Sequence, residues 1–510
     1  MSSLTRDKIL FFFIALTVLF GIGSYFWQSP VLWGFATVSA ICLVVVIHDI
    51  IQTKHTLLRN FPLIGRLRWV FEHERSKIQQ YFIEHDTNGT PYNREKRSDV
   101  YQKAKGEINS TPFGTQLNVY ETGYEFMKHS MFPKDKNDVQ DLRVTIGSKF
   151  CRKPYSASIF NISAMSFGAL SDAAVKALNG GAKLGNFYHN TGEGGLSPHH
   201  LVNGGDICFQ IGTGYFGCGE TIDGKRYFNE EAFIKTVSNP SVKMIEIKLS
   251  QGAKPAHGGI LPASKNTEEI AAIRGVKPHT QVDSPPYHTA FHDYKSMIIF
   301  IDKIRDLANG RPVGIKLCLG DESEIKELID TMNKLGSWPD FITIDGGEGG
   351  TGAAPLVFTN HVGMPLMDAL AIVNKKLIDA DLRHEIKIIA SGKASSSFDI
   401  LKLIAMGADA VNAARAFMLS MGCIQARECN NNTCPVGIAT QNRTLVNGLN
   451  PEEKKVRVYN YHHAVIHEIK ELVAAMGYTS IGSVSPYDFA KRDKSGVLKN
   501  MYNEQERIAI

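Results

Sequence analysis

The sequence has no strong excess of charge of either sign. Its 510 residues include 56 Lys and Arg against 51 Asp and Glu, so the formal net charge is only +5. Proteins that bind nucleic acids concentrate positive charge on one surface, and here part of the small excess flanks an apolar N-terminus. The balance argues against nucleic acid as a partner. A length of 510 residues leaves room for roughly two to four domains, or for one large domain with additions.

Cysteines are too few and too scattered for a disulfide scaffold. Of the eight, five are dispersed through apolar or Gly-rich stretches, which is typical of small buried hydrophobic residues. The other three, Cys423, Cys429 and Cys434, are clustered. One cluster among scattered cysteines favours a reducing compartment and a metal site over a set of disulfides.

A convincing nicotinamide-binding domain is also missing. Residues 212–217 read GTGYFG and match G-x-G-x-x-G, but the polar residues 218–224 that follow show no helical pattern. The fingerprint requires a helix at that point, because the helix N-terminus faces the pyrophosphate. We therefore expect no dinucleotide site at this string.

Two long apolar runs are present at the N-terminus, at residues 9–27 and 31–47. Neither contains Asp, Glu, Lys or Arg, and each is near the length that spans about 30 Å of hydrocarbon. The positive-inside rule predicts a two-span hairpin in the cell membrane, with the catalytic part in the cytoplasm. A cleaved signal peptide is the alternative for the first run, but it leaves the second unexplained. The flanking basic residues are Arg6 and Lys8 at one end, and Lys54, Arg59, Arg66 and Arg68 at the other.

From about residue 157 onward, short β-rich apolar runs alternate with helical patterns. Eight such strands with intervening helices predict an α/β protein with a parallel (β/α)₈ barrel, and an open doubly wound sheet is the less favoured alternative. The predicted strands are 157–163, 186–189, 207–211, 243–249, 313–319, 340–345, 386–390 and 408–412. Predicted helices include 171–183, 323–335, 396–406 and 413–421.

Glycines and polar side chains alternate directly after several predicted strands. In a barrel the chemistry lies at the C-terminal ends of the strands, and glycine lets the backbone approach a flat ligand closely. These stretches therefore predict a cofactor site, whereas ordinary turns would need only one or two glycines each. They are residues 164–169 (AMSFGA), 190–195 (NTGEGG), 250–255 (SQGAKP) and 346–352 (GGEGGTG).

Basic residues follow the last two predicted strands. Barrel enzymes commonly bind a phosphate with the loops after strands seven and eight. The candidates here are Gly392 and Lys393 after strand seven, and Ala414 and Arg415 after strand eight. The alternative is that Lys393 and Arg415 are ordinary solvated cations.

The three clustered cysteines have the spacing C-x5-C-x4-C, and a proline follows the last. No His lies between Cys423 and Val456 to complete a four-ligand zinc site. A three-iron cluster would need only three thiolates. Zinc with a distant fourth ligand and three unrelated thiols remain as alternatives.

These stretches together resemble the glutamate synthase family, over roughly residues 155–480. The arrangement is similar to the short, membrane-anchored FMN-binding members. The resemblance implies an FMN-binding barrel with a [3Fe–4S] cluster on Cys423, Cys429 and Cys434. It also implies that ammonia condenses with 2-oxoglutarate to an imine, which reduced flavin converts to L-glutamate. The motifs that carry it are residues 164–171, 190–195, 246–255, 284–286, 349–353 and 432–441.

The resemblance also implies roles for single residues. Gln251, Lys254 and Arg274 would bind 2-oxoglutarate, and Lys316 would face the flavin and stabilise its anionic reduced form. Glu193 would be catalytic, as a proton donor or by orienting the imine, if burial raises its pKa. The other expected flavin contacts are Ala164, Met165, Ser166, Gln210, Gly349, Gly350, Thr351, Gly392, Lys393, Ala414 and Arg415.

The sequence departs from the family pattern in three places. The large synthases begin with the nucleophilic cysteine of a glutaminase domain, whereas this sequence begins MSS, so ammonia is expected from another source. His257 replaces an acidic residue, and Ala290 replaces an aspartate. These changes leave open a membrane-associated flavin dehydrogenase of another small 2-oxo, 2-hydroxy or amino acid. A non-catalytic redox-sensing or scaffolding module is the third alternative.

Four segments are expected along the chain. They are a transmembrane hairpin (1–51), a neck and barrel-covering segment (52–150), the FMN-binding barrel with its iron–sulfur loop (151–480) and a C-terminal tail (481–510). The electron donor is expected to be a ferredoxin-like protein or a membrane carrier.

Overall fold

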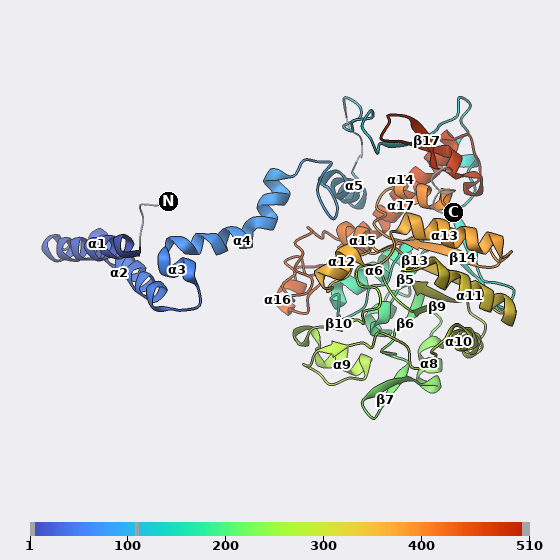
Figure 1. Cartoon of the computed structure of the whole chain (residues 1–510), viewed down its shortest axis with the longest axis horizontal. Helices are drawn as coiled ribbons and strands as arrows, with labels where there is room; N and C mark the ends of the chain where they lie inside the picture. Colours follow the sequence, from blue (N-terminus) through green and yellow to red (C-terminus); the bar gives the residue numbers. More distant parts are fainter. Residues whose placement is uncertain (1–5, 108–109, 111, 502–510) are drawn as a thin grey trace. The chain divides into compact units, whose positions relative to one another are not determined.

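The computed structural model describes residues 6–107, 110 and 112–501 of the chain. The chain divides into two compact units, residues 1–91 and 92–510, which are described separately (Figure 1).

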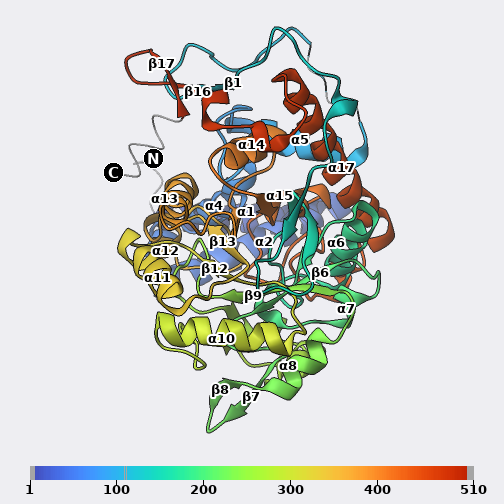
Figure 2. The same ribbon diagram turned by 90° about the vertical axis from the view of Figure 1, so that its right-hand side faces the viewer.

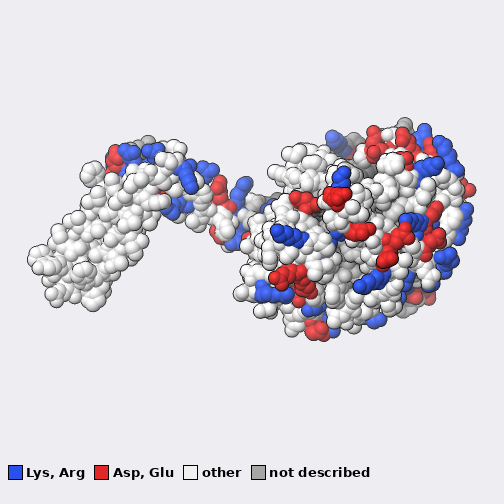
Figure 3. All heavy atoms as spheres, turned by 90° about the horizontal axis from the view of Figure 1, so that it is seen from below, with Lys and Arg blue, Asp and Glu red and all other residues white. Residues whose placement is uncertain are grey.

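The N-terminal unit begins with two apolar helices, α1 (Arg6–Trp27) and α2 (Pro30–Ile51). Pro30 opens α2 because its missing N–H would be unpaired there in any case. Both helices have a mean hydropathy of 2.3 and are long enough to cross a bilayer, and only 17% and 11% of their most apolar stretches are buried. The face in Figure 3 shows a hairpin surface largely without charged side chains. The unit continues with α3 (Thr56–Asn60), α4 (Leu67–Ile78) and a π-turn (Gln79–Ile83).

The second unit is built on a closed barrel of eight parallel strands, in the order β4, β5, β6, β9, β12, β13, β14, β15. This confirms the predicted (β/α)₈ fold. Both faces of these strands are buried, so the longer strands are mainly apolar on both faces, and polar residues within them, such as Gln210, Glu246 and Lys316, are buried as well. The strands are β4 (Phe160–Ile162), β5 (His189–Asn190), β6 (Ile207–Ile211), β9 (Val242–Lys248), β12 (Val313–Leu317), β13 (Phe341–Asp345), β14 (Lys387–Ser391) and β15 (Ala410–Ala413).

Helices cover the outside of the barrel, and Figure 2 shows α6, α10, α11 and α13 outside the strands. The barrel helices are α6 (Asp172–Gly185), α8 (Glu230–Val237), α10 (Tyr294–Leu307), α11 (Glu322–Leu335), α13 (Leu366–Asp379), α14 (Ser397–Ala405) and α15 (Arg415–Ser420). The loops carry α7 (Pro198–Leu201), β7 (Gly219–Ile222), β8 (Lys225–Phe228), β10 (Ile260–Leu261), α9 (Glu268–Arg274), β11 (Val282–Asp283), α12 (Leu356–His361) and α16 (Arg443–Val446).

Two predicted strands have different bounds in the structure. The run 157–163 is divided between β3 (Tyr155–Ser158), which pairs antiparallel with β2 (Arg143–Ile146), and the barrel strand β4. The run 186–189 begins too early, because Asn186 adopts a left-handed conformation (φ 52°) that ends α6. Only a few residue types adopt that conformation readily, and asparagine is one of them.

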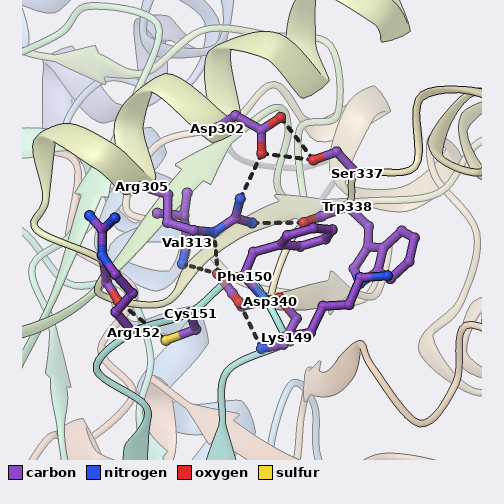
Figure 4. Close-up of polar contacts among 12 residues, drawn as sticks. Lys149, Phe150, Cys151, Arg152, Asp302, Arg305, Val313, Ser337, Trp338 and Asp340 are labelled. Atoms are coloured by element: carbon purple, nitrogen blue, oxygen red, sulfur yellow. Dashed lines mark hydrogen bonds and ion pairs between the residues drawn. The ribbon is translucent and has the colours of Figure 1, made fainter.

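A buried ion-pair network closes the N-terminal end of the barrel (Figure 4). Asp340, fully buried, accepts hydrogen bonds from the Ser148 hydroxyl at 2.6 Å, the Val313 N–H at 2.8 Å and Arg305 Nε at 3.1 Å. Arg305 also donates to the Trp338 carbonyl at 2.7 Å. These bonds join the β2–β3 connection to α10 and β12. Packing and ion pairs fill this end of the barrel. In enzymes with this fold the active site lies at the opposite, C-terminal ends of the strands.

Helices from both ends of the second unit complete it. The long helix α17 (Pro451–Ala475) packs against α6, and α5 (Arg94–Lys105) packs against α17 and α15. Lys103 of α5, almost fully buried, pairs with Glu468 of α17 at 2.7 Å. A small sheet of β1 (Glu125–Met127), β16 (Phe489–Arg492) and β17 (Leu498–Asn500) lies beside them.

Candidate active site

A cavity of about 230 Å³ lies at the C-terminal ends of the barrel strands. Thirteen of the residues singled out from the sequence line it: Ala164, Met165, Ser166, Glu193, Gln210, Gln251, Lys254, Arg274, Gly350, Thr351, Ala414, Arg415 and Cys429. Six do not: Lys316, Gly349, Gly392, Lys393, Cys423 and Cys434. The barrel thus gathers, into one cavity, side chains that are up to about half the chain apart in sequence.

Glu193 carries the only carboxylate in the cavity lining of the described chain. It sits on a short 3₁₀ turn after β5, and Lys248 Nζ at the end of β9 donates to its Oε1 at 2.9 Å. Two glycines pack directly against it. A Cβ atom added at Gly212 would lie 2.5 Å from Glu193 Cβ, and one added at Gly259 would lie 2.2 Å from Oε1. Gly212 of the GTGYFG string therefore makes room for a side chain, and the strand β7 follows the string in place of a helix.

The pKa of Glu193 is lowered, so the carboxyl group is an anion at neutral pH. Burial alone would raise it, but the nearby charges of Lys248, Arg274 and Lys254 outweigh burial. The expected net rise of this pKa is wrong, because Lys248 at the end of β9, Lys254 in the loop that follows and Arg274 at the end of α9 surround the group. Glu193 is suited to accept a proton or a hydrogen bond, and it is not a ready proton donor.

The cations around Glu193 have capacity to bind an anion. Burial lowers the pKa of Lys254 to about 8 and that of Arg274 to about 10, which leaves the arginine charged. Arg274 Nη2 donates to the Phe167 carbonyl at 3.2 Å, and its guanidinium lies 5.1 Å from the centre of the Phe216 ring. Its Nε is buried without a hydrogen-bond partner. Buried N–H groups are nearly always paired, so this one indicates a missing acceptor.

Lys316, on β12, is buried and does not line the cavity. Its Nζ is 3.2 Å from Asp345 Oδ2, and Asp345 also accepts from the Gly252 N–H at 3.0 Å. Burial disfavours the charged lysine, but Asp345 and Glu246 favour it, and the pKa of Lys316 is raised overall. Lys316 is therefore a fixed, buried cation.

A buried carboxylate, Glu246 of β9, ties four strands together under the cavity. It accepts from Asn190 Nδ2 at 2.8 Å, Gln210 Nε2 at 2.6 Å and the Thr343 hydroxyl at 2.7 Å. Gln210, which lines the cavity, is thereby held in one orientation. Glu246 stands between the apolar residues Ile245 and Ile247 of β9, and a buried charged residue at such a position is a signal that the sequence does provide.

Arg415 forms the wall of the cavity at the ends of strands β13 and β15. Its Nη2 donates to the Glu348 carbonyl at 3.1 Å, and its guanidinium lies 5.3 Å from the centre of the Tyr92 ring. A Cβ atom added at Gly350 would lie 2.6 Å from Arg415 Nε. Burial, followed by the nearby charge of Arg415, lowers the pKa of Lys393. Two cations therefore meet at this end of the barrel.

The three clustered cysteines are neighbours in space. Burial, followed by the proximity of Cys429 and Cys434, raises the pKa of Cys423 to about 12. Within the described residues, no three His, Cys, Asp or Glu side chains converge closely enough to hold one metal ion. A single zinc ion needs all its thiolates about 2.3 Å from one centre, whereas the thiolates of an iron–sulfur cluster bind different irons and lie further apart. The all-thiol set therefore fits a cluster better than a single ion.

A sequence profile described as "Conserved region in glutamate synthase" matches residues 115–479. The chain belongs to the glutamate synthase family. It is 37% identical over 500 residues to the glutamate synthase large subunit-like protein YerD of Bacillus subtilis, covering 90% of this chain and 94% of that protein. It is also 39% identical over 328 residues to the archaeal glutamate synthase [NADPH] of Methanocaldococcus jannaschii, covering 63% of this chain and 60% of that protein. The chain thus spans less than two thirds of that archaeal relative.

Solved structures align less closely. The recombinant flavin-binding domain of baker's yeast flavocytochrome b2 aligns with a TM-score of 0.43 at 13% identity, covering 80% of this chain and 83% of that one.

Two of the positions expected to depart from the glutamate synthase pattern, His257 and Ala290, do not line the cavity. The His257 ring packs against Phe358 of α12, and Ala290 donates its N–H to the Tyr215 hydroxyl. His288, next to this altered stretch, is buried between the Tyr215 hydroxyl and the Lys248 carbonyl, each at 2.9 Å. A carbonyl only accepts, so Nε2 carries the proton and Nδ1 accepts from tyrosine. Burial lowers the pKa of His288 to about 4.

Two cations of the cavity, Lys248 and Lys265, were not singled out from the sequence. Lys248 ends the apolar run VKMIEIK, and a charged residue at the C-terminal end of a barrel strand is a usable signal. Lys265 bonds only to backbone carbonyls of residues far away in sequence, so no local pattern marks it.

Proposed function

We propose that this protein is an FMN- and iron–sulfur-dependent oxidoreductase that forms L-glutamate from 2-oxoglutarate and ammonia. The observation that carries the proposal is the charge of the cavity wall around Glu193. Three buried cations, Lys248, Lys254 and Arg274, face this single carboxylate. The excess of two positive charges complements the two carboxylates of a small keto diacid, and a guanidinium suits a carboxylate bidentately.

FMN would occupy the other half of the cavity. The backbone of residues 164–166, Gly350 and Thr351 lines it, and Arg415 with the N-terminus of α15 would hold the phosphate. Lys316 would favour negative charge on the reduced ring system. When bound, FMN supplies the hydride for the reaction.

The side chains of this chain would divide the remaining work. Arg274 and Lys254 would hold the two carboxylates of 2-oxoglutarate, and Gln251 would orient them. Glu193, as an anion, would orient ammonia, accept protons from the nitrogen as the C–N bond forms, and pass them to the departing carbonyl oxygen, which leaves as water. Lys248, hydrogen-bonded to Glu193, would return a proton to the nitrogen when the imine is reduced.

The three cysteines would hold a [3Fe–4S] cluster that passes electrons from the donor to the flavin. Cys429 supports this role because it lines the same cavity as the flavin-binding backbone. We propose that α1 and α2 anchor the protein in the membrane with the barrel in the cytoplasm, since both are apolar and largely exposed within their unit. The donor would then be a ferredoxin-like protein or a membrane carrier.

Anaerobic turnover of the full-length protein in detergent tests the proposal. With a chemically reduced ferredoxin-like donor, L-glutamate should form only when 2-oxoglutarate and ammonium are both present. Acid extraction should release FMN, and iron and sulfide should be present in place of zinc. Turnover of another 2-oxo or 2-hydroxy acid without ammonium would contradict the proposal. So would the release of FAD, or of no flavin.

A further inference from the structure

A buried lysine beside the cysteine loop has no carboxylate partner among the residues that the structure describes. Lys265 follows β10 on a short 3₁₀ turn and is only 2% exposed. Its ammonium donates to three backbone carbonyl oxygens: those of Ala169 at 3.2 Å, Cys429 at 2.6 Å and Ala439 at 2.8 Å. These carbonyls come from the loop after β4, from the cysteine loop and from the segment that follows it. One side chain therefore joins three loops at the edge of the cavity.

The three carbonyls select the charged form of Lys265. An ammonium group has three N–H donors, whereas a neutral amine has two and a lone pair that would face a carbonyl oxygen. In the part of the chain that the structure describes, no Asp or Glu forms an ion pair with this lysine. Burial lowers the pKa of Lys265, whereas the thiols of Cys429 and Cys434 act in the opposite direction, so the bonds to the three carbonyls are what favour the charged form. A buried cation is unfavourable unless an anion balances it, and the bond to the Cys429 carbonyl places this lysine beside the loop that would hold the negatively charged cluster.

We propose that Lys265 is the fixed counter-charge of the iron–sulfur cluster, holding Cys429 at the cavity wall and raising the reduction potential of the cluster. The inference rests on the cluster proposed above. Reduction adds one electron to the cluster, so its negative charge increases while no bond forms or breaks. A cation held nearby in a low-dielectric interior stabilises the reduced form more than the oxidised form. Lys265 is therefore a positioning residue that acts through Cys429.

Redox titrations of the full-length protein, followed by electron paramagnetic resonance, test the inference. Lys265→Gln keeps N–H donors but removes the charge, and Lys265→Arg keeps the charge. The glutamine variant should shift the midpoint potential to more negative values, by at least tenfold in the reduction equilibrium, which is about 59 mV for one electron. The arginine variant should stay near wild type. Lys235→Gln, at an exposed position on α8, is the matched control and should not shift.

An unchanged potential in Lys265→Gln would overturn the inference, because hydrogen bonding alone would then account for the lysine. If Lys265→Gln loses its iron, retention of iron and sulfide by Lys265→Arg supports the charge role, and equal loss in both variants overturns it. Wild-type protein without iron would refute the proposed cluster itself, and the inference with it. This outcome differs from a failure of the Lys265 inference alone, because it is seen in the wild-type protein before any substitution is made.

Discussion

Replacement of Arg274 by glutamine removes the cation that is best placed to bind a substrate carboxylate. Arg274 is 5% exposed, its Nη2 is held by the Phe167 carbonyl at 3.2 Å, and its Nε has no partner. Glutamine keeps a polar group of smaller size but removes the charge and the fork-shaped pair of donors. Within the described residues, the one hydrogen bond of this side chain goes to the Phe167 carbonyl, and Phe167 does not line the cavity.

The expected loss of affinity follows from the bond that Arg274 would make. A hydrogen bond to a charged group contributes about 1.5–3 kcal/mol. The Kd for 2-oxoglutarate should therefore rise roughly 10- to 150-fold in Arg274→Gln. Isothermal calorimetry on the oxidised, flavin-loaded protein measures this directly, and flavin content should equal that of wild type.

Arg311→Gln is the matched control. Arg311 precedes β12 at the opposite end of the barrel, where it donates to the Ala308 carbonyl and does not line the cavity. Its substitution should leave the Kd unchanged. Equal affinity of wild type and Arg274→Gln for 2-oxoglutarate would refute the assignment of Arg274, and the absence of binding to wild type would refute the choice of substrate.

Three further predictions concern the flavin, pH and stability. Gly350→Ala places a Cβ atom 2.6 Å from Arg415 Nε and should lower the flavin content. Gly352→Ala is the control: its added Cβ atom would lie 3.9 Å from the nearest atom, Cys429 Cβ, so the flavin should be retained. Equal flavin contents of the two variants would refute the flavin placement. Burial lowers the pKa of Lys254 to about 8, so its positive charge is lost as pH rises through that value. The affinity for 2-oxoglutarate should fall from pH 7 to pH 9, and Lys254→Met should abolish the trend. Arg305→Met leaves a buried carboxylate unpaired and should destabilise the barrel by about 3–5 kcal/mol, seen as a lower thermal midpoint with the hairpin unaffected.

The barrel could be predicted from the sequence because its strands are buried on both faces. Residues 207–211 (ICFQI) are apolar except for Gln210, and the predicted bounds of that strand match β6. The predicted strand bounds were wrong where one predicted strand covers parts of two strands of the structure. Residues 157–163 have no internal turn signal, yet the chain leaves β3 and enters β4 at Ile159. The pairing of β3 with β2 separates β3 from β4, and the residue pattern of one strand does not show which strand it will pair with.

The site was only partly predictable, because its electrostatics depend on loops far apart in sequence. Glu193 stood out through the glycines around it, but the sign of its pKa shift depends on Lys248, Lys254 and Arg274 together. Lys265 gave no signal at all, since it recognises backbone carbonyls that any residue provides. Sequence motifs identified which residue types gather in the cavity. Only the fold shows which charges face one another.

The central claim is that reduced flavin in this cavity is oxidised by the adduct of 2-oxoglutarate and ammonia. A single-turnover experiment tests it most directly: the flavin is photoreduced without oxygen and mixed with 2-oxoglutarate, with ammonium, or with both. We expect the absorbance of oxidised flavin to return only with both, together with stoichiometric L-glutamate. Reoxidation by 2-oxoglutarate alone, or no reoxidation with both, would contradict the claim.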